Sequence, residues 1–475
     1  MCVKVISLVK CIIVFFFIFF MAVQRLGNAY ILIAYFWGGL LALYCILSLL
    51  KTIRKTPKQM FFIMLFFWYQ EFSSAQENRA LRYVSYALEI VLMIYLFFYA
   101  LKHRKRINRK QFKITTIVFI LLLGIDFIGT ISAYRNPVIF FLSAYDSCKY
   151  FILIYYILSL QPSEYDIGKL LQLLSGVVIV NTFCALLQFS GIAMFFDFFR
   201  GKYNIVKRFG SYRAIGIFPH GIELGNYSSV LFAIYYNYSK LVGRNRKPFF
   251  YFTEICLICC VITSGTRIAM ANVIIILIVS NLQNIKSFIQ TVLIILMFLL
   301  VGISCMNLSR IVIRTKMDID TELPRNYYMA KGIDVWRDYP LFGIGYATYG
   351  SDKYRTRTND IVFNKYNAHA FDYAKLSTTD SFFAEVLPEF GVIGIVTWLF
   401  YGFFIFFHYK KKNKERSFYF TFLCCILSIF IMAINTSTAF ISPHIGTWFW
   451  ISCGMLLCGK NTENELVLRN QMERV

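Results

Sequence analysis

The stretch that decides the fold is KITTIVFILLLGIDFIGTISAY at residues 113–134, where Asp126 is the one charged side chain after Lys113. A helix of roughly 20 apolar residues crosses the hydrocarbon core of a bilayer. Similar apolar blocks recur along the chain, for example at Cys11–Phe20 and Val292–Val301. The recurrence predicts a polytopic helical membrane protein.

The composition of the whole chain agrees with this prediction. Its 475 residues are 58% hydrophobic and 19% aromatic, and the mean hydropathy is +0.59. Soluble domains are on average about half apolar or less. We therefore predict an all-α fold with about 12–14 transmembrane helices in a single transmembrane domain, residues 1–475. The first block lacks a clear small-x-small cleavage site, so a helix is expected there and not a signal peptide.

The expected membrane spans lie near residues 5–23, 29–50, 59–75, 82–101, 113–134, 139–160, 167–190, 222–241, 249–264, 266–281, 287–306, 381–407, 418–436 and 442–459. The third is the weakest, because Gln70, Glu71 and two serines interrupt it. The two spans within 249–281 are short.

The net charge of +24 would suit a nucleic-acid partner, but its distribution does not. The positive residues are dispersed among short loops between apolar blocks, which is the pattern that sets membrane topology. The 13 cysteines follow no disulfide or metal-ligand spacing, and most lie in apolar runs, where cysteine packs as a small hydrophobic residue. We expect no nucleic-acid partner, no metal and no cofactor.

Four basic loops fall on one side of the membrane when the spans are counted in order; they are Lys51–Lys58, Lys102–Lys113, Lys240–Lys247 and Lys410–Arg416. Short loops rich in Lys and Arg stay cytoplasmic. The opposite, extracytoplasmic side then holds Phe195–Gly221, the turn Ser264–Arg267, the turn Ser437–His444 and a long polar loop at 307–379. That loop is expected to be partly helical from Pro324, and Pro340 and Gly343 end the helix.

Three arginines lie at unusual places on the outer side: Arg213 before a span, Arg267 in a short turn and Arg325 at the start of the loop helix. A planar guanidinium suits phosphate oxygens. The alternative is that these side chains reach lipid headgroups or pair with local acids. That alternative is less convincing for Arg267, and for Arg213 and Arg325 both interpretations stay open.

Asp380 precedes the span that begins near residue 381. It is either a helix cap or a base that deprotonates a sugar hydroxyl, and His369 is the rival base. His220 and His444 also lie on the expected outer side. Within the spans, Asp146 and Lys149 are at helical spacing for an ion pair, and a structural role is favoured for them and for Asp126.

Four segments together resemble the bacterial superfamily of O-antigen ligases and O-antigen or capsule polymerases. They are Arg213-Ala-Ile-Gly-Ile-Phe-Pro-His220, Ser264-Gly-Thr-Arg267, Trp336-Arg-Asp-Tyr-Pro-Leu-Phe-Gly-Ile-Gly345 with the preceding Arg325, and Asp380-Ser381 followed after nine residues by Gly391-Val-Ile-Gly394. The resemblance covers roughly residues 200–400. The ligases have His-Asn where this chain has Asp380-Ser381, and Asp there is more like the repeat-unit polymerases.

The resemblance implies a membrane-embedded glycosyltransferase of the C type in the bacterial cytoplasmic membrane. It would polymerise undecaprenyl-pyrophosphate-linked repeat units on the periplasmic or outer face, with a flippase and a chain-length regulator as pathway partners. The implied catalytic residues are Asp380, Arg325, Arg213 and His369, and the implied substrate-binding residues are Arg267, His220, Ser381 and Arg337. One alternative is a ligase that transfers the glycan to a lipid A core or a protein. Another is a transporter or lipid flippase, although the internal repeat typical of transporters is not evident.

Overall fold

The structure is a computed structural model that describes residues 56–75, 79–134, 137–191, 207–208, 211–218, 220–242, 247–282, 323–346, 348–349, 382–410, 416–434, 436, 439–440, 442 and 444–458. The spans expected near 5–23, 29–50 and 287–306 lie outside these residues. So do the parts of the 307–379 loop other than 323–346 and 348–349.

The described chain is helical apart from one short strand pair and one 3-10 turn. Its helices are α3 (Thr56–Ala75), α4 (Arg79–Lys102), η1 (Arg104–Arg106), α5 (Arg109–Tyr134), α6 (Pro137–Leu160), α7 (Glu164–Phe189), α9 (Gly221–Ser239), α10 (Lys247–Ser264), α11 (Arg267–Asn281), α14 (Leu323–Asp338), α17 (Phe382–Lys410), α18 (Arg416–Ala433) and α19 (Gly446–Leu457). The strands β1 (Lys207–Arg208) and β2 (Ser211–Tyr212) pair antiparallel. The sequence did not predict this pair, which is too short to change the all-α class.

Five of these helices are long and apolar enough to cross a membrane: α5, α6, α7, α10 and the part of α17 from Glu385 to Lys410. Shorter apolar helices include α11 and α19. The polytopic all-α class is thus confirmed. The total of about 12–14 spans stays a prediction, because part of the chain lies outside the described residues.

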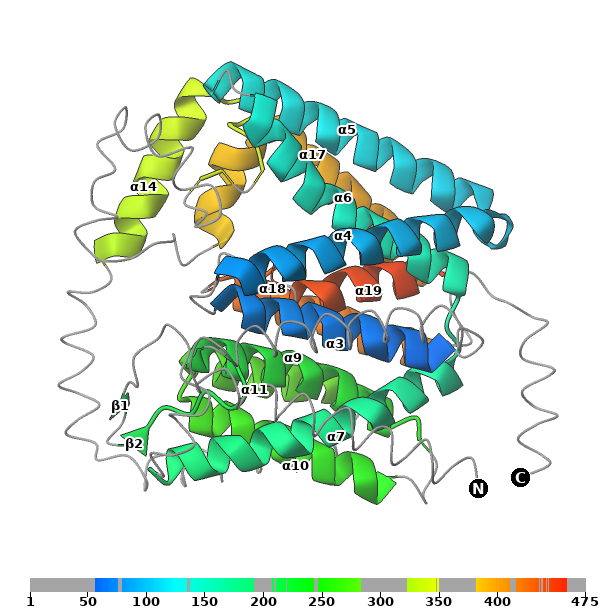
Figure 1. Cartoon of the computed structure of the whole chain (residues 1–475), viewed down its shortest axis with the longest axis vertical. Helices are drawn as coiled ribbons and strands as arrows, with labels where there is room; N and C mark the ends of the chain where they lie inside the picture. The colour runs from blue at the N-terminus through cyan, green and yellow to red at the C-terminus, as the bar shows by residue number, and fades with distance from the viewer. Residues whose placement is uncertain are drawn as a thin grey trace.

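The helices lie side by side in three tiers in Figure 1, with α5, α6 and α17 uppermost, α3, α4, α18 and α19 in the middle and α7, α9, α10 and α11 below. Helix α9 is at the centre of the lower half, and Leu224, Val230 and Ile234 on it have no exposed surface. The Asn272 amide of α11 donates to Ser229 Oγ of α9 at 3.1 Å and to Ser428 Oγ of α18 at 2.5 Å. Such side-chain bonds join helices where lipid supplies no hydrophobic driving force between them.

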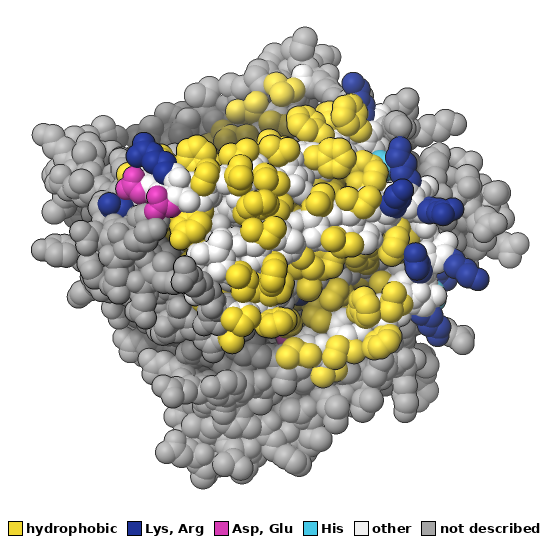
Figure 2. Space-filling view, turned by 90° about the horizontal axis from the view of Figure 1, so that it is seen from above, with side chains coloured by type: hydrophobic (Ala, Val, Ile, Leu, Met, Phe, Trp, Pro, Cys, Tyr) yellow, Lys and Arg dark blue, Asp and Glu magenta, His cyan; other side chains and the backbone are white. Residues whose placement is uncertain are grey.

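One end of the bundle carries the basic loops. Arg104–Arg106 precede α5, α5 begins at Arg109, Lys240 follows α9, and α17 ends at Lys410. Seen from the α5 side, hydrophobic side chains cover the middle of the face, most Lys and Arg gather along one edge, and a smaller group lies beside Asp and Glu at the opposite edge (Figure 2). The family-like segments lie at the opposite ends of these same helices, as the counted spans predicted.

A buried ion-pair cluster joins α4 and α6. The Lys149 ammonium lies 3.1 Å from the Asp146 carboxylate and 3.4 Å from that of Glu89, and all three side chains are at most 7% exposed. The predicted Asp146–Lys149 pair is confirmed. Glu89 was not predicted as a partner, because it lies 60 positions earlier in the chain.

Candidate functional site

The first two family-like segments meet directly. The Arg213 side chain is 8% exposed, its Nε donates to the Ser264 carbonyl at 2.7 Å, and its Nη2 donates to Thr266 Oγ1 at 2.9 Å. The Thr266 hydroxyl in turn donates to the Gly221 carbonyl at 3.1 Å. The guanidinium therefore ties the turn between α10 and α11 to the chain that enters α9.

The segment that follows Arg213 is held by amide side chains of α7. Oε1 of Gln188 accepts from the backbone N–H groups of Ile215 at 3.0 Å and Gly216 at 2.7 Å, and its Nε2 donates to the Gly216 carbonyl at 2.9 Å. Oδ1 of Asn181 accepts from the Ile217 N–H at 3.0 Å. Gly216 has φ +58°, and a Cβ there would collide with the Asn181 side chain. Glycine is therefore required, both for its backbone angle and for the missing side chain.

Two helix N-termini adjoin at this place. Arg267 is the first residue of α11 and is exposed, and the Gly221 carbonyl at the start of α9 accepts from Thr266, the N-cap of α11. His220 caps α9, because its Nδ1 accepts from the Ile222 N–H at 3.1 Å. A neutral ring that accepts at Nδ1 carries its proton on Nε2 and can donate from there. Helix N-termini attract anions, and an exposed guanidinium beside two of them strengthens that preference.

The other two family-like segments also interlock. The N–H of Ile344 donates to the Pro388 carbonyl at 2.8 Å, and the N–H of Val392 donates to the Pro340 carbonyl at 2.9 Å. Helix α17 is broken at Gly391, with φ 58° and ψ −172°. A Cβ on Gly391 would lie 2.5 Å from backbone atoms of Leu341. The Pro-Leu-Phe-Gly segment and the Gly-x-x-Gly segment are thus joined by direct backbone contact, and this contact requires glycine at positions 343 and 391.

Helix α14 is the helical portion of the described part of the long polar loop. Its start beside Pro324 and its end before Pro340 confirm the predicted helix. Val335 is fully buried against Ala133 and Tyr134 at the end of α5. Arg325 lies in the first turn of α14, at the end far from this contact.

Arg337 lies in the last turn of α14 and is exposed. It forms an ion pair with Asp334 at 3.5 Å, in which the two side chains are 70% and 40% exposed. Exposed pairs of this kind contribute little to stability. The predicted substrate-binding role of Arg337 stays a prediction.

The remaining expected site residues, Asp380, Ser381 and His369, lie outside the described residues. Helix α17 begins at Phe382, immediately after the first two of them in the sequence. The Phe382 ring packs on Phe440 with centroids 4.5 Å apart. Phe440 belongs to the turn before α19, and so does His444, whose ring packs on that of Phe218 with centroids 5.4 Å apart.

This turn connects the start of α17 with the segment that follows Arg213. Both interlocked pairs of segments are therefore at the end of the bundle that also carries α14, β1 and β2 in Figure 1.

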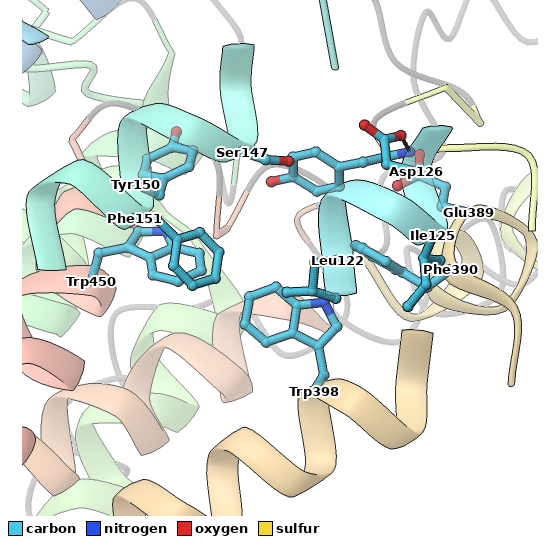
Figure 3. Close-up of a pocket in the computed structure, with 11 residues that line it drawn as sticks. Leu122, Ile125, Asp126, Ser147, Tyr150, Phe151, Glu389, Phe390, Trp398 and Trp450 are labelled. Atoms are coloured by element: carbon cyan, nitrogen blue, oxygen red, sulfur yellow. Dashed lines mark hydrogen bonds between the residues drawn. The ribbon is translucent and has the colours of Figure 1, made fainter. Parts of the chain in front are cut away.

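A cavity of about 20 Å³ lies among α5, α6, α17 and α19 beneath the interlock. Figure 3 shows Asp126 and Glu389 on one side of it and Tyr150, Phe151 and Trp450 on the other. Burial raises the pKa of the Tyr346 phenol, which also lines the cavity, well above its usual range. Room for about one water is too little for a sugar. We therefore place the candidate site outside this cavity, at the segment ends.

No group of three or more His, Cys, Asp or Glu side chains is arranged for a metal among the residues that the structure describes. Sequence reasoning missed Gln188, Asn181 and Glu389 as residues that hold the site together. Each is a polar residue within an apolar span, and a polar residue in such a span usually has a specific partner. That signal was present, but it does not name the partner.

Comparison with known proteins supports the resemblance. Residues 252–399 match the model of a family described as O-Antigen ligase, and no curated protein matches the chain. The matched region contains the Ser264–Arg267 turn, α14 and the interlocked glycine segments, while the Arg213 segment precedes it. The central and C-terminal part of this protein therefore matches the O-Antigen ligase family, in agreement with the superfamily that its four segments resemble.

Proposed function

We propose that the protein polymerises undecaprenyl-pyrophosphate-linked oligosaccharide repeat units at the outer face of the bacterial cytoplasmic membrane. The O-Antigen ligase family that residues 252–399 match implies a membrane glycosyltransferase that uses lipid-linked glycans. The observation that carries the proposal is the convergence of Arg267 with the N-termini of α9 and α11. This arrangement suits a pyrophosphate at the membrane boundary.

The orientation follows from charge. The basic residues before α5, after α9 and at the end of α17 lie at the end of the bundle opposite the candidate site. Short loops rich in Lys and Arg are retained in the cytoplasm. The site then faces the periplasm or the cell exterior, where lipid-linked repeat units are presented to such enzymes.

The arginines have different tasks in this proposal. Arg267 is exposed, so its guanidinium contacts the pyrophosphate together with Arg325 from α14. Arg213 uses Nε and Nη2 to hold the Ser264–Thr266 turn. Its task is therefore to position Arg267, and it does not contact the substrate itself. His220 donates from Nε2 to a phosphate or sugar oxygen, and Ser381 and Arg337 contact the glycan.

The chemistry is transfer of a glycosyl group. A sugar hydroxyl of one lipid-linked repeat attacks the anomeric carbon of a glycan on a second lipid. The new C–O bond forms as the bond to the pyrophosphate oxygen breaks, and the pyrophosphate takes the electron pair. Asp380 accepts the hydroxyl proton, and His369 is the alternative base. Fixed cations that stabilise the departing charge supply the main electrostatic contribution.

Ligation is the second candidate, because the matching family model is itself described as O-Antigen ligase. A ligase would transfer the finished glycan to a lipid A core or a protein and leave chain length unchanged. Polymerisation is preferred here because Asp380 stands where the ligases have histidine.

The test uses purified protein in liposomes with an undecaprenyl-pyrophosphate-linked oligosaccharide, with and without a lipid A core acceptor. Product length is followed on gels. A ladder formed without the acceptor supports polymerisation. Transfer to the acceptor alone, with unchanged glycan length, would establish ligation instead. Asp380→Ala should abolish the ladder and Arg325→Ala should leave only slow transfer of single repeats, whereas Lys331→Ala, a control on α14 at a partly exposed residue that pairs with Asp334, should preserve it.

A further inference from the structure

The segment that follows α14 is buried within the membrane bundle, although it belongs to the long polar loop. Ile344 is 1% exposed, Tyr346 8% and Tyr349 not at all. Buried backbone N–H groups need acceptors. The segment is continuous with α14, so the groups that accept from its N–H groups also hold α14 in place.

Two of the acceptors are carboxylates from different helices. Asp126 Oδ1 of α5 accepts from the Tyr346 N–H at 2.8 Å, and Glu389 Oε1 of α17 accepts from the Tyr349 N–H at 3.0 Å. These two acidic residues are 4% and 2% exposed. Hydrogen bonds to an ionised acceptor are about twice as strong as neutral ones. Two different helices, α5 and α17, therefore supply the acceptors that hold this segment.

Helix α6 contributes to the same anchor. Ser143 Oγ donates to Asp126 Oδ2 at 2.7 Å, and Thr130 Oγ1 donates to Asp126 Oδ1 at 3.3 Å. The carboxylate is thus oriented by three donors from α5, α6 and the segment itself. Asp126 was expected to be structural, and these bonds show which structure it supports.

The packing leaves the segment no room to shift. A Cβ on Gly129 of α5 would lie 2.9 Å from the Gly343 carbonyl oxygen. A Cβ on Gly345, which has φ +107°, would collide with the Thr130 hydroxyl. Gly345 N–H also donates to the Glu389 carbonyl at 3.2 Å. Backbone meets backbone on both sides.

Helix α14 extends from this anchor as a rigid arm. The Gly343 N–H donates to the Tyr339 carbonyl at 3.1 Å, and the Tyr339 N–H donates to that of Val335, also at 3.1 Å. With a rise of 1.5 Å per residue, Arg325 lies about 20 Å from the anchored end. A tilt of about 10° at the base would move it by about 3.5 Å on that lever arm. Misplacement of about 1 Å can cost a hundredfold in rate.

We propose that Asp126 and Glu389 are positioning residues, which set the location of Arg325 by fixing the backbone at Tyr346 and Tyr349. The proposal rests on the proposed function, in which Arg325 contacts the pyrophosphate. It assigns to two intramembrane carboxylates a role in transfer that they perform without touching substrate. A merely structural role would lower the amount of folded protein but would not depend on Arg325.

The experiment is a double-mutant cycle on transfer rates in liposomes, with the rate normalised to folded protein. Asp126→Ala and Glu389→Ala should each lower kcat by about tenfold to a hundredfold with little change in KM. Asp126→Asn and Glu389→Gln keep an acceptor oxygen and should lose less. Added to Arg325→Ala, each should cause no further loss, because the arm then has no arginine to place. Ser132→Ala, which removes only a local bond within α5, is the matched control.

Hydrogen exchange reports the anchor without any assay of activity. The amides of Tyr346 and Tyr349 should exchange faster in the variant that lacks the corresponding carboxylate, while the amides of α9 keep their protection. If Asp126→Asn and Glu389→Gln already abolish folding, Ser143→Ala, which removes the hydroxyl that donates to Asp126 Oδ2, should still speed exchange of the Tyr346 amide.

The inference would be overturned if the rate losses of the Asp126 and Glu389 variants multiplied with the loss caused by Arg325→Ala. It would also be overturned if the amides of Tyr346 and Tyr349 kept their protection in these variants. Either result would leave the proposed function intact. Full activity of Arg325→Ala would instead overturn the proposed function, whereas the exchange result would still test the anchor.

Discussion

The two interlocked regions of the site are built in opposite ways. Around Arg213 a cation bonds to the neutral Ser264 carbonyl and Thr266 hydroxyl, and Arg267 beside it is exposed. Around Gly343 two anions capture backbone N–H groups, and the cation Arg325 stands at the far end of α14. In each region buried charge holds backbone in place. Buried charged residues thus hold the backbone in both regions, while the proposed function assigns contact with substrate to Arg267 and Arg325.

The most severe test of the interlock is Gly391→Ala. A side chain at φ +58° is strained, and the new methyl group would press on the backbone of Leu341 at 2.5 Å. We expect a stability loss of about 3 kcal/mol from both effects together. Gly402→Ala lies on the same helix with nothing within 4 Å, so it should be neutral or stabilising. Thermal unfolding in detergent measures both, and equal melting temperatures would refute the interlock.

Arg267→Ala separates chemistry from structure in the first region. The side chain is exposed, so the melting temperature should stay nearly constant, whereas the transfer rate should fall about a hundredfold, as with loss of one fixed electrostatic contact. Arg109→Ala at the opposite end of the bundle is the control for charge alone. A rate unchanged by Arg267→Ala would remove this arginine from the proposed pyrophosphate site.

Arg213→Ala should give the complementary result. It leaves the buried Ser264 carbonyl and Thr266 hydroxyl without this donor, and each such loss costs about 1–3 kcal/mol. The melting temperature should therefore fall markedly. Arg213→Lys, which keeps the charge but not the forked geometry, should recover only part of it. If Arg213→Ala is as stable as the native chain, the two arginines do not differ as the comparison requires.

The smallest effect is expected at the outer end of the second region. Arg337→Ala breaks an ion pair whose partners are 70% and 40% exposed, which should change stability by less than about 0.5 kcal/mol. Chemical denaturation in detergent would measure this. A loss above about 1 kcal/mol would show a tertiary contact for Arg337 that an exposed pair cannot explain.

Sequence reasoning found what local signals encode. The helix from Leu323 to Asp338 has a proline at its start and another just beyond its end, and the turn between α10 and α11 lies between two apolar runs. The Asp146–Lys149 pair follows from helical spacing alone.

Contacts between distant segments could not be found in this way. Nothing in the residues near Arg213 points to the Ser264 carbonyl, 51 positions later. The pairing of Gly343 with the break at Gly391 likewise depends on the tertiary arrangement. A glycine in the sequence indicates backbone freedom, but it does not predict which other backbone segment packs against it. Gln188 and Glu389 were visible as polar residues in apolar spans, and their partners were not.

The glycine interlock also bears on the order in which the chain is assembled. Its bonds join Pro340–Gly345 to Pro388–Ile393, so α14 is synthesised well before the helix that receives it. In the proposed orientation, a growing chain must deliver α14 across the membrane and then insert the first turns of α17 before the two can meet. Docking of α14 is therefore a late event of biogenesis. A nascent chain arrested before Pro388 would contain α14 but not the segment of α17 that binds it.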